Sequence, residues 1–390
     1  MLVGLIIIYA ISPQQANVRN IIYGSDYSPS YFFIKQLVSV AAAIIAFTIA
    51  AKVPAEFTIK RVAKPILITS FLVCIILAIA GALKLGIANC SFGACRWVDF
   101  GFINFQPSEL LKLGLLLCLA IIFGTAMKQG HINKLGTLTP AAVIIGVSLF
   151  FVVIAQKDLG TGIALISIVL SMLVASGMSW KHIGVMLSIA VILGVLFTVT
   201  SEHRRERILT YFNPNNENSY HINNAKIAIG SGGLFGVGIG RSIQSTGYLP
   251  ESINDSVFAI IGETFGFIGL MVVIALFVSL LLTLLKNMHY THDPVYRLIF
   301  AGVFGWLGAH VMMNIAAMTG IMPLTGITLP FLSYGGTSIV FMAATLGLAF
   351  QLSGYTAHTP ANERKIDEDT NGRRGIRRTR YSSVGRHHRA

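Results

Sequence analysis

Long runs of apolar residues, separated by short polar segments, dominate the pattern along this chain. About 20 apolar residues rise about 30 Å as an α-helix, which matches the hydrocarbon core of a bilayer. Ten such runs can be distinguished, at residues 1–12, 33–51, 66–83, 108–127, 138–155, 160–178, 183–200, 257–285, 297–319 and 333–353. The pattern therefore predicts an all-α membrane protein, a polytopic bundle of about ten transmembrane helices with a large loop between spans seven and eight.

The first run is shorter than a membrane span. Residues 1–12 would extend only about 18 Å as a helix. The run lacks the basic segment that opens a signal peptide. We interpret it as a span that is either clipped or continued by residues upstream, with Pro13 just beyond its end.

Charge sets the expected topology. Loops on the side of the N-terminus, together with the tail, carry 18 Lys and Arg residues, and loops on the opposite side carry 9. This asymmetry predicts cytoplasmic N- and C-termini. The membrane domain then covers residues 1–353, followed by a basic, disordered cytoplasmic tail at 354–390. Although the net charge is +13, a tail beside ten spans is expected to fix topology and to contact anionic lipid, so no nucleic-acid partner is expected.

The four cysteines divide into two classes. Cys74 and Cys118 fall inside spans and are expected to pack as small apolar groups. Cys90 and Cys95 share one outer loop, where a disulfide is permitted if the compartment is oxidising and the Cβ geometry allows it. Two cysteines without nearby histidines do not complete a zinc site.

Charged and polar residues mark the outer ends of several spans. Glu109 and Lys112 are three apart in the first turns of a helix, so they can form an ion pair, contact a substrate, or do both. Asp158 precedes a span and is interpreted first as a helix N-cap. His310 and Asn314 share one helix face and are expected to hydrogen-bond across helices.

The loop before residue 257 combines basic residues with glycines and ends in acids. Gly232, Gly236 and Gly240, at four-residue spacing, predict close backbone packing against a span. No GK[ST] follows them, which excludes a phosphate loop. Asp255 and Glu263 lie about 12 Å apart along a helix and cannot form a direct carboxylate pair. We expect Glu263 to pair within the bundle.

Five stretches of the chain, taken together, resemble the SEDS family (shape, elongation, division and sporulation), the polytopic peptidoglycan glycosyltransferases that include FtsW, RodA and SpoVE. The matching stretches are "RWVDFG…QPSELLKL", "QKDLGTG", "IAIGSGGLFGVGIG", "GYLPESINDSVFAIIGETFGFIG" and "TGIMPLTGITLPFLSYGGTS". They occur in the family's order. "GVGIG" and "IGETFGF" look more like the division protein FtsW than the elongation protein RodA. Lys157 departs from the family, which usually has Pro there.

The resemblance implies a function, a set of site residues and partners. The chain is then expected to polymerise lipid II on undecaprenyl pyrophosphate at the extracytoplasmic face of the bacterial plasma membrane, at the division septum. Asp255 matches the family's essential acid, acting as general base or holding a divalent cation such as Mg or Mn. The expected partners are a class B penicillin-binding protein transpeptidase and other division proteins. Residues expected to bind substrate are Arg96, Glu109, Lys112, Asp158, Arg207, Lys226 and Arg241.

Three other functions stay open from the residues alone. A lipid II flippase or transporter would also use intramembrane charges and helices broken by Pro and Gly. A non-catalytic division scaffold would tolerate loss of Asp255. An elongation-type, RodA-like role would place the same chemistry in the lateral wall.

Overall fold

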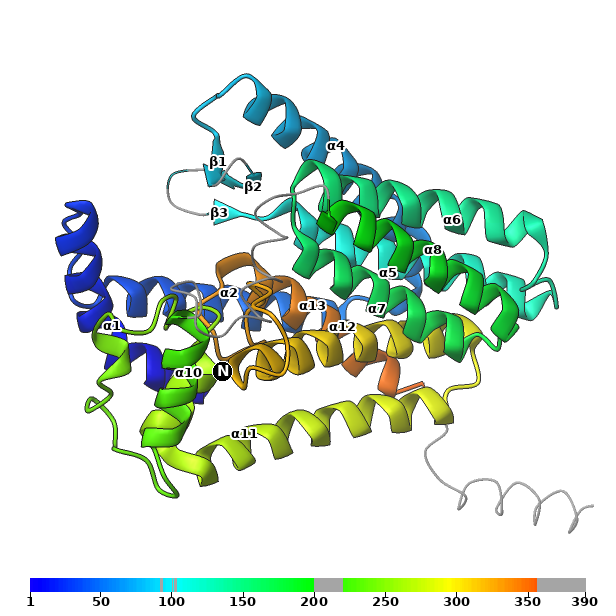
Figure 1. The fold of residues 1–390 in the computed structure, drawn as a ribbon. Helices are drawn as coiled ribbons and strands as arrows, with labels where there is room; N and C mark the ends of the chain where they lie inside the picture. The colour runs from blue at the N-terminus through cyan, green and yellow to red at the C-terminus, as the bar shows by residue number, and fades with distance from the viewer. Residues whose placement is uncertain (92–93, 100, 102–103, 200–219, 356–390) are drawn as a thin grey trace, which may run out of the picture.

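The computed structural model describes residues 1–91, 94–99, 101, 104–199 and 220–355 and shows a helical bundle with a small sheet at one end (Figure 1). Its long helices are α1 (Leu2–Tyr23), α2 (Tyr31–Lys52), α4 (Ala63–Ala82), α5 (Pro107–Lys128), α6 (Leu135–Leu149), α7 (Leu159–Ala175), α8 (Trp180–Val199), α11 (Val257–Tyr290), α12 (Pro294–Met318) and α13 (Gly336–Ser353). The short elements are α3 (Ala55–Phe57), the π-helical turns η1 (Thr58–Val62) and η2 (Phe150–Ala155), α10 (Tyr220–Ser231) and the 3₁₀ turn η4 (Gln244–Thr246). The strands are β1 (Ala88–Ser91), β2 (Ala94–Asp99) and β3 (Asn104–Phe105).

The helices confirm a polytopic membrane bundle. Within the described residues, seven helical stretches are long and apolar enough to cross a membrane, two of them continued through η1 and η2. Helix α7 is apolar but has only 17 residues. The chain is therefore a multi-pass membrane protein, and the total of ten spans stays a prediction.

The first helix is longer than the sequence pattern indicated. Helix α1 continues through Pro13 to residue 23, whereas the apolar run stops at residue 12. A proline inside a helix is tolerated in membrane proteins where neighbouring groups satisfy the freed backbone. The residues around Pro13 are also bound to other segments: Ser12 donates to the carbonyl of Pro29 at 2.7 Å, and Gln15 donates to the carbonyl of Ser245 at 3.0 Å. These distant contacts, absent from the local pattern, hold the polar half of the helix.

The sheet was not predicted either. Strands β1, β2 and β3 form an antiparallel sheet in the order β1-β2-β3, in the segment read as an outer loop. Cys90 pairs with Cys95 across β1 and β2, and Val98 pairs with Phe105 across β2 and β3. In Figure 1 the sheet, α10 and the start of α11 lie at the left, which we call the sheet end, and the α5–α6 and α11–α12 turns lie at the opposite end.

Helices α5 and α12 form the centre of the bundle. Their most apolar windows are 67% and 78% buried, against 22% for α2. Helix α12 packs on α5, α7 and α11, and α5 also packs on α4. Trp306 and Phe123 are fully buried in this core, and so is Lys112. A lysine without exposed surface at the centre of an apolar bundle requires partners.

The glycine loop, residues 232–240 after α10, packs into a break in helix α11. Gly266 adopts φ 68° and ψ −166° inside α11, which interrupts the helix. A Cβ at Gly232 or Gly236 would overlap the backbone of α11, whereas Gly240 faces open space. The predicted close packing is thus confirmed for the first two glycines and is wrong for the third. Backbone bonds replace the helical ones: the amides of residues 237 and 238 donate to the carbonyls of 263 and 264, and the amides of 267 and 268 donate to the carbonyls of 233 and 234.

Candidate active site at the sheet end of the bundle

A buried ion pair occupies the first turns of α5. Lys112 Nζ lies 2.9 Å from Glu109 Oε1, and the two side chains are 0% and 4% exposed. The predicted pairing on one helix face is confirmed. Pro107 at the first helical position and Glu109 in the first turn both favour a helix start here.

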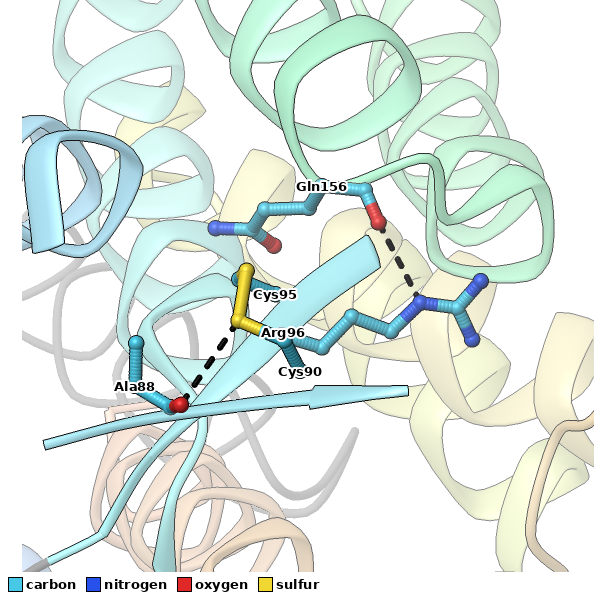
Figure 2. The surroundings of a disulfide bond; sticks show 5 residues. All are labelled: Ala88, Cys90, Cys95, Arg96 and Gln156. Carbon is cyan, nitrogen blue, oxygen red and sulfur yellow. Dashed lines mark hydrogen bonds between the residues drawn. A yellow bond between two sulfur atoms is a disulfide. The ribbon is translucent and has the colours of Figure 1, made fainter. Parts of the chain in front are cut away.

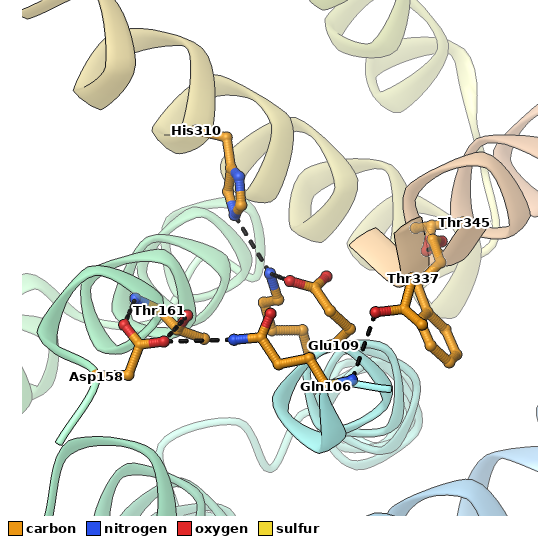
Figure 3. Close-up of polar contacts among 9 residues, drawn as sticks. Gln106, Glu109, Asp158, Thr161, His310, Thr337 and Thr345 are labelled. Atoms are coloured by element: carbon orange, nitrogen blue, oxygen red, sulfur yellow. Dashed lines mark hydrogen bonds and ion pairs between the residues drawn. The ribbon is translucent and has the colours of Figure 1, made fainter. Parts of the chain in front are cut away.

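Helix α12 completes the surroundings of Lys112. Its Nζ lies 3.3 Å from Nε2 of His310 and 4.8 Å from the ring centroid of Trp306. A lysine ammonium can only donate, so His310 Nε2 accepts and the imidazole carries its proton on Nδ1. Figure 3 shows His310 reaching from α12 toward the ion pair on α5. The interpretation of His310 as a residue that bonds across helices is confirmed.

Asp158 caps helix α7 and also reaches toward α5. Its carboxylate accepts from the backbone N–H of Thr161 at 3.0 Å and from the hydroxyl of Thr161 at 2.9 Å, which confirms the N-cap. Gln106, the residue before α5, donates to the same carboxylate at 3.4 Å (Figure 3). The starts of α5 and α7 are thus joined through polar side chains.

Asp255 lies in the turn that precedes α11. The residue is half-buried, and its backbone carbonyl accepts from Asn314 Nδ2 at 2.7 Å. The same Asn314 amide group donates to the carbonyl of Ile327 at 2.7 Å. Asn314 was expected to hydrogen-bond across helices, but both of its partners lie in non-helical segments. It lies one turn from His310 on the same helix. Helix α12 links the main chain of Asp255 to the buried ion pair.

The Pro- and Gly-rich segment between α12 and α13 separates the two aspartates. A Cβ at Gly160, in the first turn of α7, would lie 2.8 Å from the carbonyl of Thr325, so the segment packs directly on the helix that Asp158 caps. On its other side, a Cβ at Gly326 would lie 3.6 Å from Oδ2 of Asp255. Ile327, Leu329 and Ser333, further along the segment, are buried. The irregular backbone of this segment is packed within protein, as expected.

The basic residues predicted to bind substrate occupy different surroundings. Arg96 donates from Nε to the carbonyl of Gln156 at 3.2 Å and from Nη2 to the carbonyl of Lys157 at 2.8 Å. Lys226 on α10 and Arg241 beyond the glycine loop are both exposed. Arg207 lies outside the described residues, with Arg204 and Arg205.

Glu263 anchors the segment that follows the glycine loop. Its carboxylate accepts from the Ser242 hydroxyl at 2.5 Å and from the amides of Ile243 and Gln244 at 2.9 Å and 3.2 Å. The prediction that this buried acid pairs within the bundle is confirmed, and its partners are neutral donors. Glu251 lies in the turn before Asp255, where its carboxylate accepts from Asn254.

Two contacts at this end of the bundle were not predicted from the sequence. His221 on α10 lies 2.7 Å from the Ser256 hydroxyl, which in turn donates to the carbonyl of Pro250 at 2.9 Å. Gln106 was also missed, although its place directly before Pro107 at a helix start was a usable signal. No spacing in the sequence connects His221 to Ser256, which are 35 positions apart.

The donor set decides how a divalent cation could be held. Among the described residues, no group of three or more His, Cys, Asp or Glu side chains could hold a metal ion. Asp255 alone would supply one carboxylate. One protein carboxylate completed by phosphate oxygens and water is a common arrangement for Mg²⁺.

Comparisons with known proteins agree on one family. The pattern of the cell cycle protein family FTSW_RODA_SPOVE matches residues 1–358. A Taylorella equigenitalis protein named "Probable peptidoglycan glycosyltransferase FtsW" is 32% identical over 330 residues, covering 83% of this chain and 88% of the relative. Stage V sporulation protein E of Bacillus subtilis is 31% identical over 367 residues, covering 91% of this chain and 94% of the relative.

A solved structure has the same fold. One chain of a peptidoglycan synthase complex, described for its coordination of polymerization and crosslinking, superposes with a TM-score of 0.68 at 23% identity. The superposition covers 91% of this chain and 98% of that chain. The arrangement of helices is therefore shared along nearly the whole of both chains.

Proposed function

Because the chain belongs to the FtsW/RodA/SpoVE family of cell cycle proteins, we propose that it is a peptidoglycan glycosyltransferase. Its substrate is lipid II, which it polymerises into glycan strands during septal cell-wall synthesis. The observation that carries this function is the place of Asp255: half-buried, held through its main chain by Asn314, and linked along α12 to a buried ion pair. The name of the Taylorella relative supports the activity.

Asp255 acts as the general base of an inverting transfer. The 4-hydroxyl oxygen of the acceptor sugar forms a bond to the anomeric carbon of the donor, and its proton passes to the Asp255 carboxylate. The bond from that carbon to the pyrophosphate oxygen breaks, and its electron pair leaves with undecaprenyl pyrophosphate. A base within hydrogen-bond reach of the hydroxyl contributes about 10²–10⁴-fold in rate.

The departing pyrophosphate requires positive charge. Two exposed cations, Lys226 with its Nζ beside Gly320 and Arg241 beside Gly238, are suited to contact its oxygens, and an arginine offers forked donors. Arg207 is assigned to the same role from the sequence. A divalent cation, if used, would be held by Asp255 together with pyrophosphate oxygens, and it would neutralise charge on the leaving group.

The buried cluster supports the active centre rather than reacting. Lys112 has no exposed surface and already contacts Glu109, His310 and Trp306. We assign Glu109, Lys112 and Asp158 to fixing the starts of α5 and α7, so that the segment beside Asp255 has a rigid base. A role in contacting substrate would need this cluster to open.

The sheet end is assigned to the extracytoplasmic side. This orientation rests on the excess of Lys and Arg in the other loops and in the tail, 18 against 9. The chain then works in the bacterial plasma membrane at the division septum. A class B penicillin-binding protein transpeptidase is its proposed partner, which is consistent with a fold shared with a complex that couples polymerization and crosslinking.

Polymerisation of labelled lipid II by the purified chain tests the function. The assay compares wild type with Asp255→Asn, each with and without the transpeptidase partner. We expect glycan from the wild type and a rate about 10²–10⁴-fold lower from the variant. A folded variant that polymerises at the wild-type rate would exclude Asp255 as the base. A chelator arm decides the cation, since loss of activity restored by Mg or Mn is expected only if one is used.

The same preparation separates the other functions. A flippase would move labelled lipid II across vesicles without forming glycan, and a scaffold would do neither. A fluorescent fusion placed along the lateral wall instead of the septum would indicate the elongation-type role.

A further inference from the structure

A disulfide closes the hairpin that carries Arg96. Cys90 on β1 and Cys95 on β2 are bonded, and Arg96 is the next residue along β2 (Figure 2). A Cβ added to Gly81 of α4 would lie only 2.5 Å from the Sγ of Cys95, so the disulfide packs directly on α4. Cys90 is exposed, which leaves the bond accessible to reagents in solution.

Arg96 binds the backbone of the loop that ends at Asp158. Its guanidinium donates to the carbonyls of Gln156 and Lys157, and Figure 2 shows it extending from the hairpin to this loop. Lys157 adopts φ 51°, a left-handed conformation that is costly for a lysine unless its surroundings hold it. The forked cation satisfies two carbonyls at this strained turn.

The loop is connected through packing to Asp255. Asp158 caps α7, and Gly160 in the next turn packs on the carbonyl of Thr325. Residue 326 of that segment faces the Asp255 carboxylate. The Gln156–Lys157 turn is therefore joined by direct contacts, through the cap and then the segment, to the wall beside Asp255.

Strand β2 holds the opposite side of the same cluster. It pairs with β3 through Val98 and Phe105, and the next residue along the chain is Gln106, which donates to Asp158. The strand thus fixes both partners of the Gln106–Asp158 contact, one through Arg96 and one through β3. The disulfide fixes the strand itself against α4.

We propose that Arg96, presented by the disulfide-bonded hairpin, is a positioning residue for Asp255 and does not bind the substrate. The role rests on the proposed glycosyltransferase function. Reduction of the disulfide by a dithiol transfers two electrons to the two sulfurs, each of which takes up a proton, and the dithiol becomes a cyclic disulfide. Because this releases the hairpin from its cross-link, it weakens the hold of Arg96 on the loop.

Amide hydrogen exchange tests, without requiring catalysis, the part of the proposal in which Arg96 holds the Gln156–Lys157 loop. The full chain in lipid nanodiscs is compared as wild type, wild type treated with dithiothreitol, Arg96→Gln, and the control Lys84→Gln, an exposed residue near the same hairpin. The amide of Thr161, which donates to Asp158, is expected to exchange about tenfold faster in the treated and Arg96→Gln samples. Exchange in α12 and in the Lys84→Gln control should not change.

Kinetics of lipid II polymerisation test the positioning half. Arg96→Gln is expected to lower kcat about tenfold with KM within about twofold, because the loss is of geometry and not of substrate contacts. Arg96→Lys keeps the positive charge but lacks the forked donors, so its kcat should lie between those of wild type and Arg96→Gln. A Cys90→Ser/Cys95→Ser variant should have the same kcat as reduced wild type, and dithiothreitol should not change it.

Opposite results overturn the proposal. A raised KM with unchanged kcat and unchanged Thr161 exchange would mean that Arg96 binds substrate directly. Equal exchange and equal kcat in wild type and Arg96→Gln would mean that the loop holds its shape unaided. A wild-type chain that makes no glycan would instead refute the proposed function, and the exchange data would still decide whether Arg96 holds the loop.

Discussion

The Glu109–Lys112 pair can be tested by removing each charge alone and both together. Glu109→Gln and Lys112→Met keep the approximate volume of each side chain and remove one charge each. Both side chains are buried, at 4% and 0% exposure, with 2.9 Å between Oε1 and Nζ. Breaking a buried pair by removing one partner costs about 3–5 kcal/mol, because the remaining charge stays buried without compensation.

The two single variants should lower the free energy of unfolding by different amounts. Without Glu109, the Lys112 ammonium still contacts His310 and the ring of Trp306, so Glu109→Gln should lie near 3 kcal/mol, about the lower end of the range. Without Lys112, Glu109 Oε1 loses its hydrogen-bond donor, and Oε2 has no donor in the described part of the chain. Lys112→Met should therefore lie near 5 kcal/mol, about the upper end.

The double variant leaves neither charge unpaired, so it should cost far less than the sum of the two. A coupling free energy of about 3 kcal/mol or more follows from these figures. The measurement is unfolding in mixed micelles, followed by tryptophan fluorescence. The exposed pair Glu56 and Lys60, with side chains 69% and 73% exposed, is the matched control and should couple by about 0.5 kcal/mol or less. Additive effects at Glu109 and Lys112 would refute the argument.

Three further perturbations probe the same end of the bundle. Gly236→Ala should destabilise by about 2–4 kcal/mol, because its Cβ overlaps the α11 backbone at a φ of 82°, whereas Gly146→Ala in open space should change the melting temperature little. Asn314→Leu removes the donor that holds the Asp255 carbonyl and should slow lipid II polymerisation about tenfold, so an unchanged rate would contradict that role. Burial raises the pKa of Tyr334 from 10.0 to about 12. The folded chain therefore keeps a proton that the unfolded chain loses, and stability should fall as pH rises from 10 to 12, less steeply in Tyr334→Phe by thermal melting.

The sequence predicted what depends on local pattern. Apolar runs longer than about 17 residues appear as helices, because a bilayer leaves few other ways to satisfy the backbone. The pairing of Glu109 with Lys112 and the cap at Asp158 follow from helix spacing alone. Each of these contacts joins residues three positions apart.

The parts that were missed depend on contacts between distant segments. Helix α1 continues past Pro13 because groups far along the chain, such as the Ser245 carbonyl, bind its polar half. Arg96 was expected to bind substrate, and that stays a prediction, but its contacts with carbonyls about 60 positions away follow from no local spacing. A charge pattern shows that a cation is present at this end of the bundle but not which oxygens it meets.

The two acids that flank the start of α11 illustrate how one apolar run carries two different tasks. The break at Gly266 opens α11 to the glycine loop, and the carboxylate of Glu263 binds the segment that follows this loop. That segment is therefore fixed to the first turns of α11 before the chain reaches residue 251. The turn containing Asp255 is thus attached to α11 at both ends: before it by the contacts of Glu263, and after it by the chain itself, which enters α11 at residue 257. Asn314 holds the turn from α12. Both carboxylate oxygens of Glu263 accept from neutral donors, and this anchoring lets the half-buried Asp255 keep a defined position at the sheet end of the bundle.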